Sequence, residues 1–166
     1  MSFKTKLHVL LGALLLAGSV VRAELTPGAA FPALERVKFE GALPADLAGK
    51  VVLVDFWASW CGPCKASFPA LNKIHHEYAD RGLRILGVSV DERRPAYEAF
   101  LSRMKPEFAV VRDAQQQLVG QVQVPTMPTS YLLDRTGKVR FVHRGYHPTT
   151  DEELRKEISQ LLDEKS

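Results

Sequence analysis

Two cysteines are the residues of this 166-residue chain with the clearest capacity for chemistry. They are the only cysteines in the sequence, and Gly62 and Pro63 separate Cys61 from Cys64. Paired thiols at this spacing, where a strand passes into a helix, are typical of reversible dithiol chemistry. A cysteine-rich zinc cluster is excluded because it needs more thiols, and a structural disulfide gains little from closing so short a loop. Metal binding together with histidines and an inert pair remain as alternatives.

The two thiols should differ in role because they differ in position. A helix N-terminus presents unpaired amides and the positive end of the helix dipole, which lowers the pKa of a cysteine placed there. We therefore expect Cys61 to attack a substrate disulfide, and the more buried Cys64 to resolve the mixed disulfide. Gly62 leaves the sulfur open to a partner, and Pro63 preorganises the first helical turn. We expect no metal and no cofactor beyond the dithiol.

Asp55 is a third candidate for the chemistry. It lies inside the apolar run 51–57, which reads VVLVDFW. An isolated carboxylate is costly to bury in such a strand, so its pKa should be raised toward neutrality. Asp55 could then accept the proton of Cys64 when that thiol attacks. The alternative is a structural aspartate that pairs with Lys50 or Lys73.

The elements that must position these residues alternate between apolar runs and amphipathic stretches. Runs over 51–57 and 84–90 predict central strands, and the segment 64–81 between them has apolar residues at helical spacing. Such a unit predicts parallel strands with a right-handed crossover. We expect an α/β fold with a mixed central sheet and helices on both faces. The further predicted elements are a short N-terminal strand or hairpin over 37–41, a helix over 95–104, a strand over 108–111, a helical segment over 115–121, antiparallel strands over 130–134 and 139–143, and a C-terminal helix capped by Thr150 with Glu153.

Residues 1–23 have the pattern of a secretory signal peptide. Two lysines precede an apolar run over 7–21, and a small-x-small cleavage site ends at Ala23. This predicts one domain over 24–166 with enough chain for a single core, exported to a compartment where disulfides persist, such as a bacterial periplasm. The alternative is an uncleaved membrane anchor, for which the run is short against a span of about 20 residues.

Charge gives no sign of a polyanionic partner. The chain has 22 Lys and Arg against 19 Asp and Glu, and three of the basic residues and none of the acidic ones fall in 1–23, which leaves 19 of each sign. A balanced domain does not indicate binding to nucleic acid or to an anionic membrane. We expect a monomer.

The segment 54–65, VDFWASWCGPCK, resembles the active-site segment of thioredoxin almost residue for residue. With its signal pattern, Gly49-Lys50 ahead of the first central strand, PTSYLLD over 128–134 and GKV over 137–139, the chain resembles the TlpA/ResA branch of the thioredoxin superfamily. The resemblance covers roughly residues 31–162. It implies a thioredoxin-like fold.

The resemblance also implies a substrate-binding surface around the dithiol. It places a cis peptide bond before Pro128, consistent with the near restriction of cis bonds to X-Pro. It implies that the backbone of Met127 pairs with an extended substrate peptide. Trp60, Gly62 and Pro63 complete this expected surface.

One departure separates this chain from its branch. Members often carry a glutamate three residues after the second cysteine, where this chain has Ser67, and many lack the strand acid that is kept here as Asp55. We therefore expect proton handling of the thioredoxin kind. The branch's specificity for cytochrome c maturation is attributed to that glutamate, so the resemblance gives less support for the same specificity in this chain.

The sequence thus predicts an extracytoplasmic thiol:disulfide oxidoreductase that reduces protein disulfides through Cys61 and Cys64. The resemblance implies disulfide-bearing envelope proteins such as apocytochrome c as acceptors, and a membrane thiol reductase of the DsbD or CcdA kind as electron donor. Alternatives are a disulfide-forming oxidant, a thiol peroxidase, and a non-enzymatic copper-site assembly protein that uses the thiols and Met127. A peroxidase would need Ser or Thr three residues before its cysteine, and Ser59 does not have this spacing.

Overall fold

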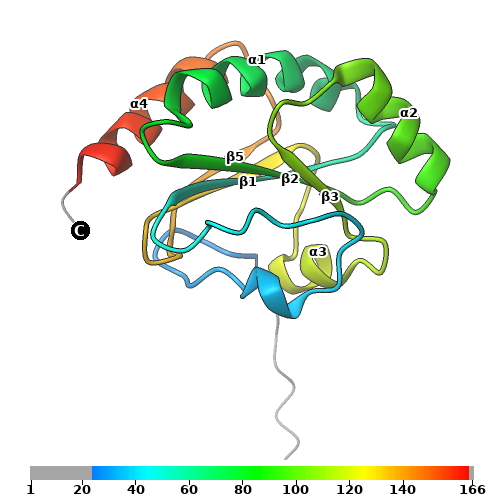
Figure 1. Cartoon of the computed structure of the whole chain (residues 1–166), viewed down its shortest axis with the longest axis horizontal. Coiled ribbons are helices and arrows are strands. Elements are labelled where there is room, and N and C mark those ends of the chain that lie inside the picture. Colours follow the sequence, from blue (N-terminus) through cyan, green and yellow to red (C-terminus); the bar gives the residue numbers. More distant parts are fainter. Residues whose placement is uncertain (1–23, 165–166) are drawn as a thin grey trace, which may run out of the picture.

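A mixed five-stranded sheet forms the centre of the computed structural model, which describes residues 24–164 (Figure 1). Its strands are β1 (Val51–Trp57), β2 (Leu83–Ser89), β3 (Ala109–Arg112), β4 (Thr129–Leu133) and β5 (Val139–Arg144). Their order across the sheet is β3-β2-β1-β4-β5. The pairs β1–β2 and β2–β3 are parallel, whereas β4 runs antiparallel to both β1 and β5.

Helices cover both faces of this sheet. They are α1 (Gly62–Tyr78), α2 (Arg94–Met104), α3 (Gln117–Val122) and α4 (Thr150–Asp163), with a short 3-10 helix η1 (Leu34–Arg36). In Figure 1, α1, α2 and α4 lie on one face and α3 on the other. Because α1 connects the parallel strands β1 and β2, the predicted strand–helix–strand unit is confirmed. The predicted mixed sheet with helices on both faces is also confirmed.

Strand β1 lies at the centre of the sheet and is buried along its whole length. Its side chains point alternately to the two faces. Trp57 stacks on Phe100 and meets Phe68 edge-on beneath α1 and α2. Phe56 meets Tyr131 edge-on, 5.9 Å between ring centroids. The apolar run therefore places β1 in the middle of the core, and Asp55, its one polar residue, is buried with it.

The N-terminal segment does not form the predicted strand or hairpin over 37–41. Within residues 24–164, this segment pairs with the sheet only through isolated bridges, from Ala30 to Lys138 and from Glu40 to Arg112. Arg112 exchanges both backbone hydrogen bonds with Glu40, at 2.8 and 3.0 Å. The segment thus contacts β3 at one edge and the start of β5 at the other, without a continuous ladder.

The predicted cap of the last helix is wrong by one residue. Thr149 is the N-cap of α4, and its side chain makes no capping hydrogen bond. The hydroxyl of Thr150 is occupied elsewhere, because it accepts a hydrogen bond from the His147 amide at 3.0 Å. The reciprocal bonds expected between Thr150 and Glu153 therefore do not form.

The predicted signal peptide, residues 1–23, lies outside the described residues, as do residues 165 and 166. Its cleavage after Ala23 stays a prediction. Across residues 24–164, every helix is too short or too polar to span a bilayer.

Candidate redox-active site

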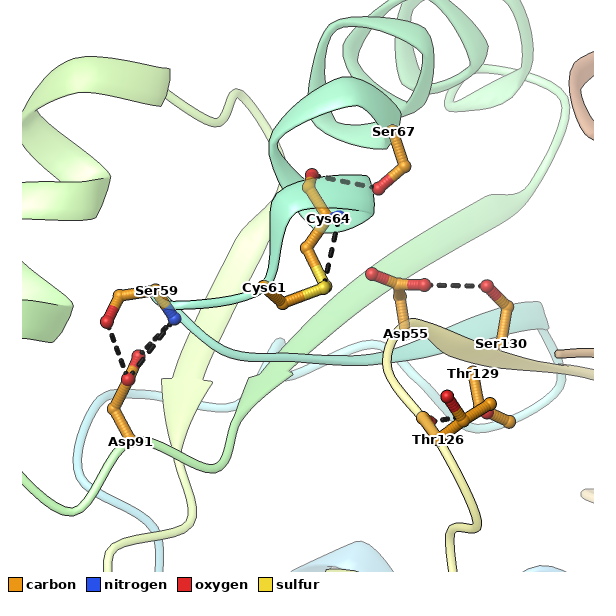
Figure 2. Close-up of a disulfide and its surroundings, with 9 residues drawn as sticks. All are labelled: Asp55, Ser59, Cys61, Cys64, Ser67, Asp91, Thr126, Thr129 and Ser130. Atoms are coloured by element: carbon orange, nitrogen blue, oxygen red, sulfur yellow. Dashed lines mark hydrogen bonds between the residues drawn. A yellow bond between two sulfur atoms is a disulfide. The ribbon is translucent and has the colours of Figure 1, made fainter. Parts of the chain in front are cut away.

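Cys61 and Cys64 lie at the start of α1, just after β1 ends, and their sulfurs form a disulfide with an S–S distance of 2.08 Å (Figure 2). Cys61 is the N-cap residue of α1, and its sulfur accepts a hydrogen bond from the Cys64 amide at 3.1 Å. Cys61 retains 5% exposure, whereas Cys64 is fully buried. The order of burial is the one expected for an attacking and a resolving thiol.

Asp55 projects from β1, and Figure 2 shows its carboxylate directed toward the disulfide. The Ser130 hydroxyl donates a hydrogen bond to Oδ1 at 2.6 Å, while Oδ2 is buried and has no partner in the described structure. Burial raises the pKa of Asp55 to about 7, and the hydrogen bond from Ser130 opposes this shift. The alternative pairing with Lys50 or Lys73 is wrong, because the one polar partner of Asp55 in residues 24–164 is Ser130.

Asp91 holds the loop that leads to Cys61, a role that the sequence did not reveal. Its carboxylate accepts the Ser59 amide at 3.0 and 3.2 Å, the Ser59 hydroxyl at 2.7 Å and the Ser89 hydroxyl at 2.9 Å. Asp91 is only 3% exposed. The available signal was its position just past β2, because the carboxyl ends of neighbouring parallel strands meet at one edge of a sheet.

The loop before β4 comes to the same edge. Its peptide bond between Met127 and Pro128 is cis, which confirms the prediction. Thr129, the next residue, pairs with Phe56 near the end of β1. This pairing brings Pro128, which is buried, close to the strand end from which the dithiol departs.

A cleft of about 490 Å³ lies between that loop and the dithiol turn. Trp60 and Met127 contribute to its walls, together with Val90 and Val119. Trp60 is 70% exposed, and among the described residues it is the one large apolar side chain that is exposed. An apolar cleft next to a reactive centre is the usual form of a binding site for a substrate side chain.

The five predicted substrate-binding residues therefore divide into two groups. Trp60 and Met127 line the cleft, and Pro128 follows directly. Gly62 and Pro63 are exposed at the start of α1 and are not part of the cleft wall.

Ser67 occupies the position at which the related branch often has glutamate. It is buried, and its hydroxyl donates a hydrogen bond to the Cys64 carbonyl at 3.0 Å. This position therefore supplies a hydrogen bond to the helix backbone and no acid. Asp55 is left as the buried carboxylate that faces the dithiol.

Comparison with known proteins agrees with this geometry. The family model described as Redoxin matches residues 28–158. The thiol-disulfide oxidoreductase ResA of Bacillus thuringiensis (strain Al Hakam) is 36% identical over 94 residues, 57% of this chain and 54% of that protein. The ResA of Geobacillus kaustophilus (strain HTA426) is 32% identical over 117 residues, 70% of this chain and 66% of that protein. The chain thus spans about half of the first relative's length.

A solved structure extends the match to nearly a whole protein. A Chlorobium tepidum protein described as a thiol:disulfide interchange protein DsbE superposes with a TM-score of 0.77 and 36% identity. The match covers 84% of this chain and 99% of that one. The predicted thioredoxin-like fold is thereby confirmed. The chain belongs to the Redoxin family, in the thioredoxin-like branch of the ResA and DsbE proteins.

Proposed function

We propose that this protein is a thiol:disulfide oxidoreductase that reduces disulfides in other polypeptides. One observation carries the proposal. A disulfide, in which Cys61 is 5% exposed and Cys64 is fully buried, lies beside an open cleft, and an unpartnered carboxylate oxygen of Asp55 is directed toward this disulfide. Relatives named thiol-disulfide oxidoreductase and thiol:disulfide interchange protein support the proposal.

The reaction runs in two exchanges from the reduced protein. The Cys61 thiolate attacks one sulfur of the substrate disulfide, which forms a mixed disulfide and releases the other substrate sulfur to take up a proton. Cys64 then transfers its proton to Asp55, and its sulfur attacks the sulfur of Cys61. The second substrate thiol leaves, and the protein ends in the disulfide form. Two electrons have passed from the dithiol to the substrate.

Asp55 suits the second exchange because of where it is buried. With a pKa of about 7, its carboxylate can both accept and release a proton near neutral pH. Ser130 binds Oδ1 and fixes the carboxylate orientation, which leaves Oδ2 free for the proton. Asp55 therefore acts as the general base for Cys64.

The proposal also covers the direction of electron flow, the location of the protein and its partners. Gly-Pro between the cysteines is the thioredoxin pair, and thioredoxin has a potential of about −270 mV, against about −120 mV for the oxidant DsbA. We infer a monomeric reductant that is exported by residues 1–23. Disulfide-bearing envelope proteins, such as apocytochrome c, would accept its electrons. A membrane thiol reductase of the DsbD or CcdA kind would supply them.

The exchange mechanism is tested with two single-cysteine variants and a disulfide-bonded peptide. Cys64→Ser should accumulate a stable mixed disulfide through Cys61, visible by mass spectrometry, whereas Cys61→Ser should trap little. Wild type should release both peptide thiols. Trapping by Cys61→Ser alone, or by neither variant, would contradict the assigned roles.

The direction is tested by the reduction potential of the Cys61/Cys64 pair in equilibrium with glutathione or dithiothreitol. A potential near about −270 mV supports a reductant. A potential near about −120 mV would make the protein a disulfide-forming oxidant instead.

A further inference from the structure

Three arginines differ from all the others in the described chain. Arg36, Arg93 and Arg103 make no side-chain hydrogen bond or ion pair within residues 24–164. Every other arginine there donates to a carboxylate or to a backbone carbonyl. The guanidinium groups of these three are therefore available to a partner.

Each of these three arginines lines either the cleft that contains Trp60 or a cleft that shares a wall residue with it. Arg93 lines the cleft that contains Trp60, which we call the dithiol cleft. Arg103 lines a neighbouring cleft of about 220 Å³, to which Lys65 of α1 also contributes. Arg36 lines a third cleft of about 400 Å³. We call Arg36, Lys65, Arg93 and Arg103 the basic rim.

The cleft that contains Trp60 adjoins each of the other two, because it shares wall residues with both. Ser59 and Ala96 belong both to the dithiol cleft and to the cleft of Arg103. Gln116 belongs both to the dithiol cleft and to the cleft of Arg36. A polypeptide bound at the dithiol would thus extend past basic side chains on either side.

Few acids oppose the basic rim. Asp91 and Glu92 are the acidic residues that line these clefts. Asp91 is buried, and its carboxylate oxygens already accept hydrogen bonds from Ser59 and Ser89. Glu92 is left as the exposed acid, against four exposed bases. Since residues 24–166 carry equal numbers of acidic and basic residues, this excess is a property of these clefts and not of the domain as a whole.

We infer that the basic rim recognises acidic side chains that flank the reactive cysteine of the substrate polypeptide. The inference rests on the proposed function, whose substrate class it narrows. Charges of one sign that line a cleft raise the local concentration of an oppositely charged partner and speed its association. The basic rim would act in this way before the sulfurs meet.

Three synthetic peptide disulfides test the inference with the reduced full-length protein. They are identical except that the residues flanking the cysteines are Asp, Asn or Lys. The second-order rate constant should fall in the order Asp, Asn, Lys, by about tenfold or more between the extremes at low salt. The difference should largely disappear near 1 M salt, where charges are screened within about 3 Å.

Single charge reversals locate the effect. Arg93→Glu and Arg103→Glu should each lower the ratio of the Asp-peptide rate to the Asn-peptide rate severalfold. Lys138→Glu is the matched control, because it makes the same charge change in the turn between β4 and β5, at the end of the sheet away from the dithiol. It should leave the ratio unchanged. Equal rates for the three peptides, or equal effects of all three reversals, would overturn the inference.

A binding measurement separates this inference from the proposed function. Peptides with Ser in place of Cys cannot react, and their binding can be followed by the fluorescence of the exposed Trp60. Tighter binding of the Asp peptide would support the inference even if the protein reduced no disulfide, and equal binding would overturn it. Failure to reduce a small neutral disulfide such as 2-hydroxyethyl disulfide would count against the proposed function alone.

Discussion

At the scale of single residues, burial gives the site its chemistry. Asp55 lies in an apolar strand, where one oxygen has the Ser130 hydroxyl and the other has no partner. A carboxylate in water would be ionised and too weak a base to take a thiol proton near neutral pH. The same desolvation that destabilises ionised Asp55 therefore makes it able to accept the proton of Cys64.

The first prediction concerns Asp55→Asn and the pH dependence of stability. Because burial raises the pKa of Asp55 to about 7 in the folded oxidised protein, folding favours the protonated acid. This contribution is fully present below pH about 4, the unfolded pKa, and is lost as pH rises through about 7. Between pH 4 and pH 8, the unfolding free energy of wild type should fall by about 4 kcal/mol relative to Asp55→Asn. Urea unfolding of both oxidised proteins measures it, and parallel pH profiles would contradict it.

The second prediction concerns Ser130→Ala. The hydrogen bond from Ser130 lowers the pKa of Asp55, so its removal should raise that pKa further. The pH midpoint of the resolving step, measured in single turnover, should move upward. Ser67→Ala is the control, because its buried hydroxyl bonds to the Cys64 carbonyl and not to Asp55. An equal shift in both variants would point to a general disturbance of the site.

At the scale of elements, the dithiol loop is fixed by a contact between two strand ends. Ser59 lies just past β1 and Asp91 just past β2, and three hydrogen bonds join them. A further backbone bond from the Val90 amide to the Trp57 carbonyl, 2.9 Å long, holds the same two ends together. The start of α1 is thereby positioned by the parallel pairing of the sheet.

The third prediction concerns Asp91→Ala. The change leaves the Ser59 amide and the Ser89 hydroxyl without their acceptor in a buried site, so the unfolding free energy should fall by about 2–3 kcal/mol. Hydrogen exchange of the Ser59 amide should also accelerate. The control is Asp134→Ala, which removes a carboxylate that accepts two amides in an exposed turn and should destabilise less. Equal losses of unfolding free energy in the two variants would show that the contact of Asp91 with the dithiol loop stabilises the fold no more than an exposed turn does.

The elements also show what the sequence could and could not predict. The bounds of β1 were predicted without error, because a strand that is covered on both faces appears in the sequence as a continuous apolar run. The dithiol and Asp55 were identified because their chemistry is local in sequence. Ser130 and Asp91 were missed, because their partners lie 75 and 32 residues away and depend on strand register. Propensity alone does not set such a register.

At the scale of the whole molecule, Arg112 connects the N-terminal segment to the dithiol face. Its side chain is 6% exposed and bonds to Glu40. It also donates to the carbonyls of Asp91 and Glu92 at 3.1 and 2.8 Å. One arginine thus joins the segment before β1, the edge strand β3 and the loop that holds Ser59.

The fourth prediction concerns Arg112→Gln. Because the variant leaves the carbonyls of Asp91 and Glu92 without their donor, and leaves Glu40 with Arg94 alone, the unfolding free energy should fall by about 3 kcal/mol. Arg140→Gln is the matched control, since its ion pair with Glu164 lies near the surface and should contribute little. Chemical unfolding of the two variants measures the difference. Equal losses would mean that the bonds of Arg112 to the inner loop add nothing.

The two isolated bridges of the N-terminal segment have a consequence for self-association. The outer edges of β3 and β5 would otherwise present free amides and carbonyls, on which a strand of another molecule could pair. Glu40 takes up both backbone groups of Arg112 on one edge, and Gly28 and Ala29 bond to Val139 on the other. A single stretch of chain therefore covers part of both open edges of the sheet. Without this stretch, both edge strands would be exposed to pairing with other molecules. The protein's resistance to aggregation therefore depends on residues that take no part in its chemistry.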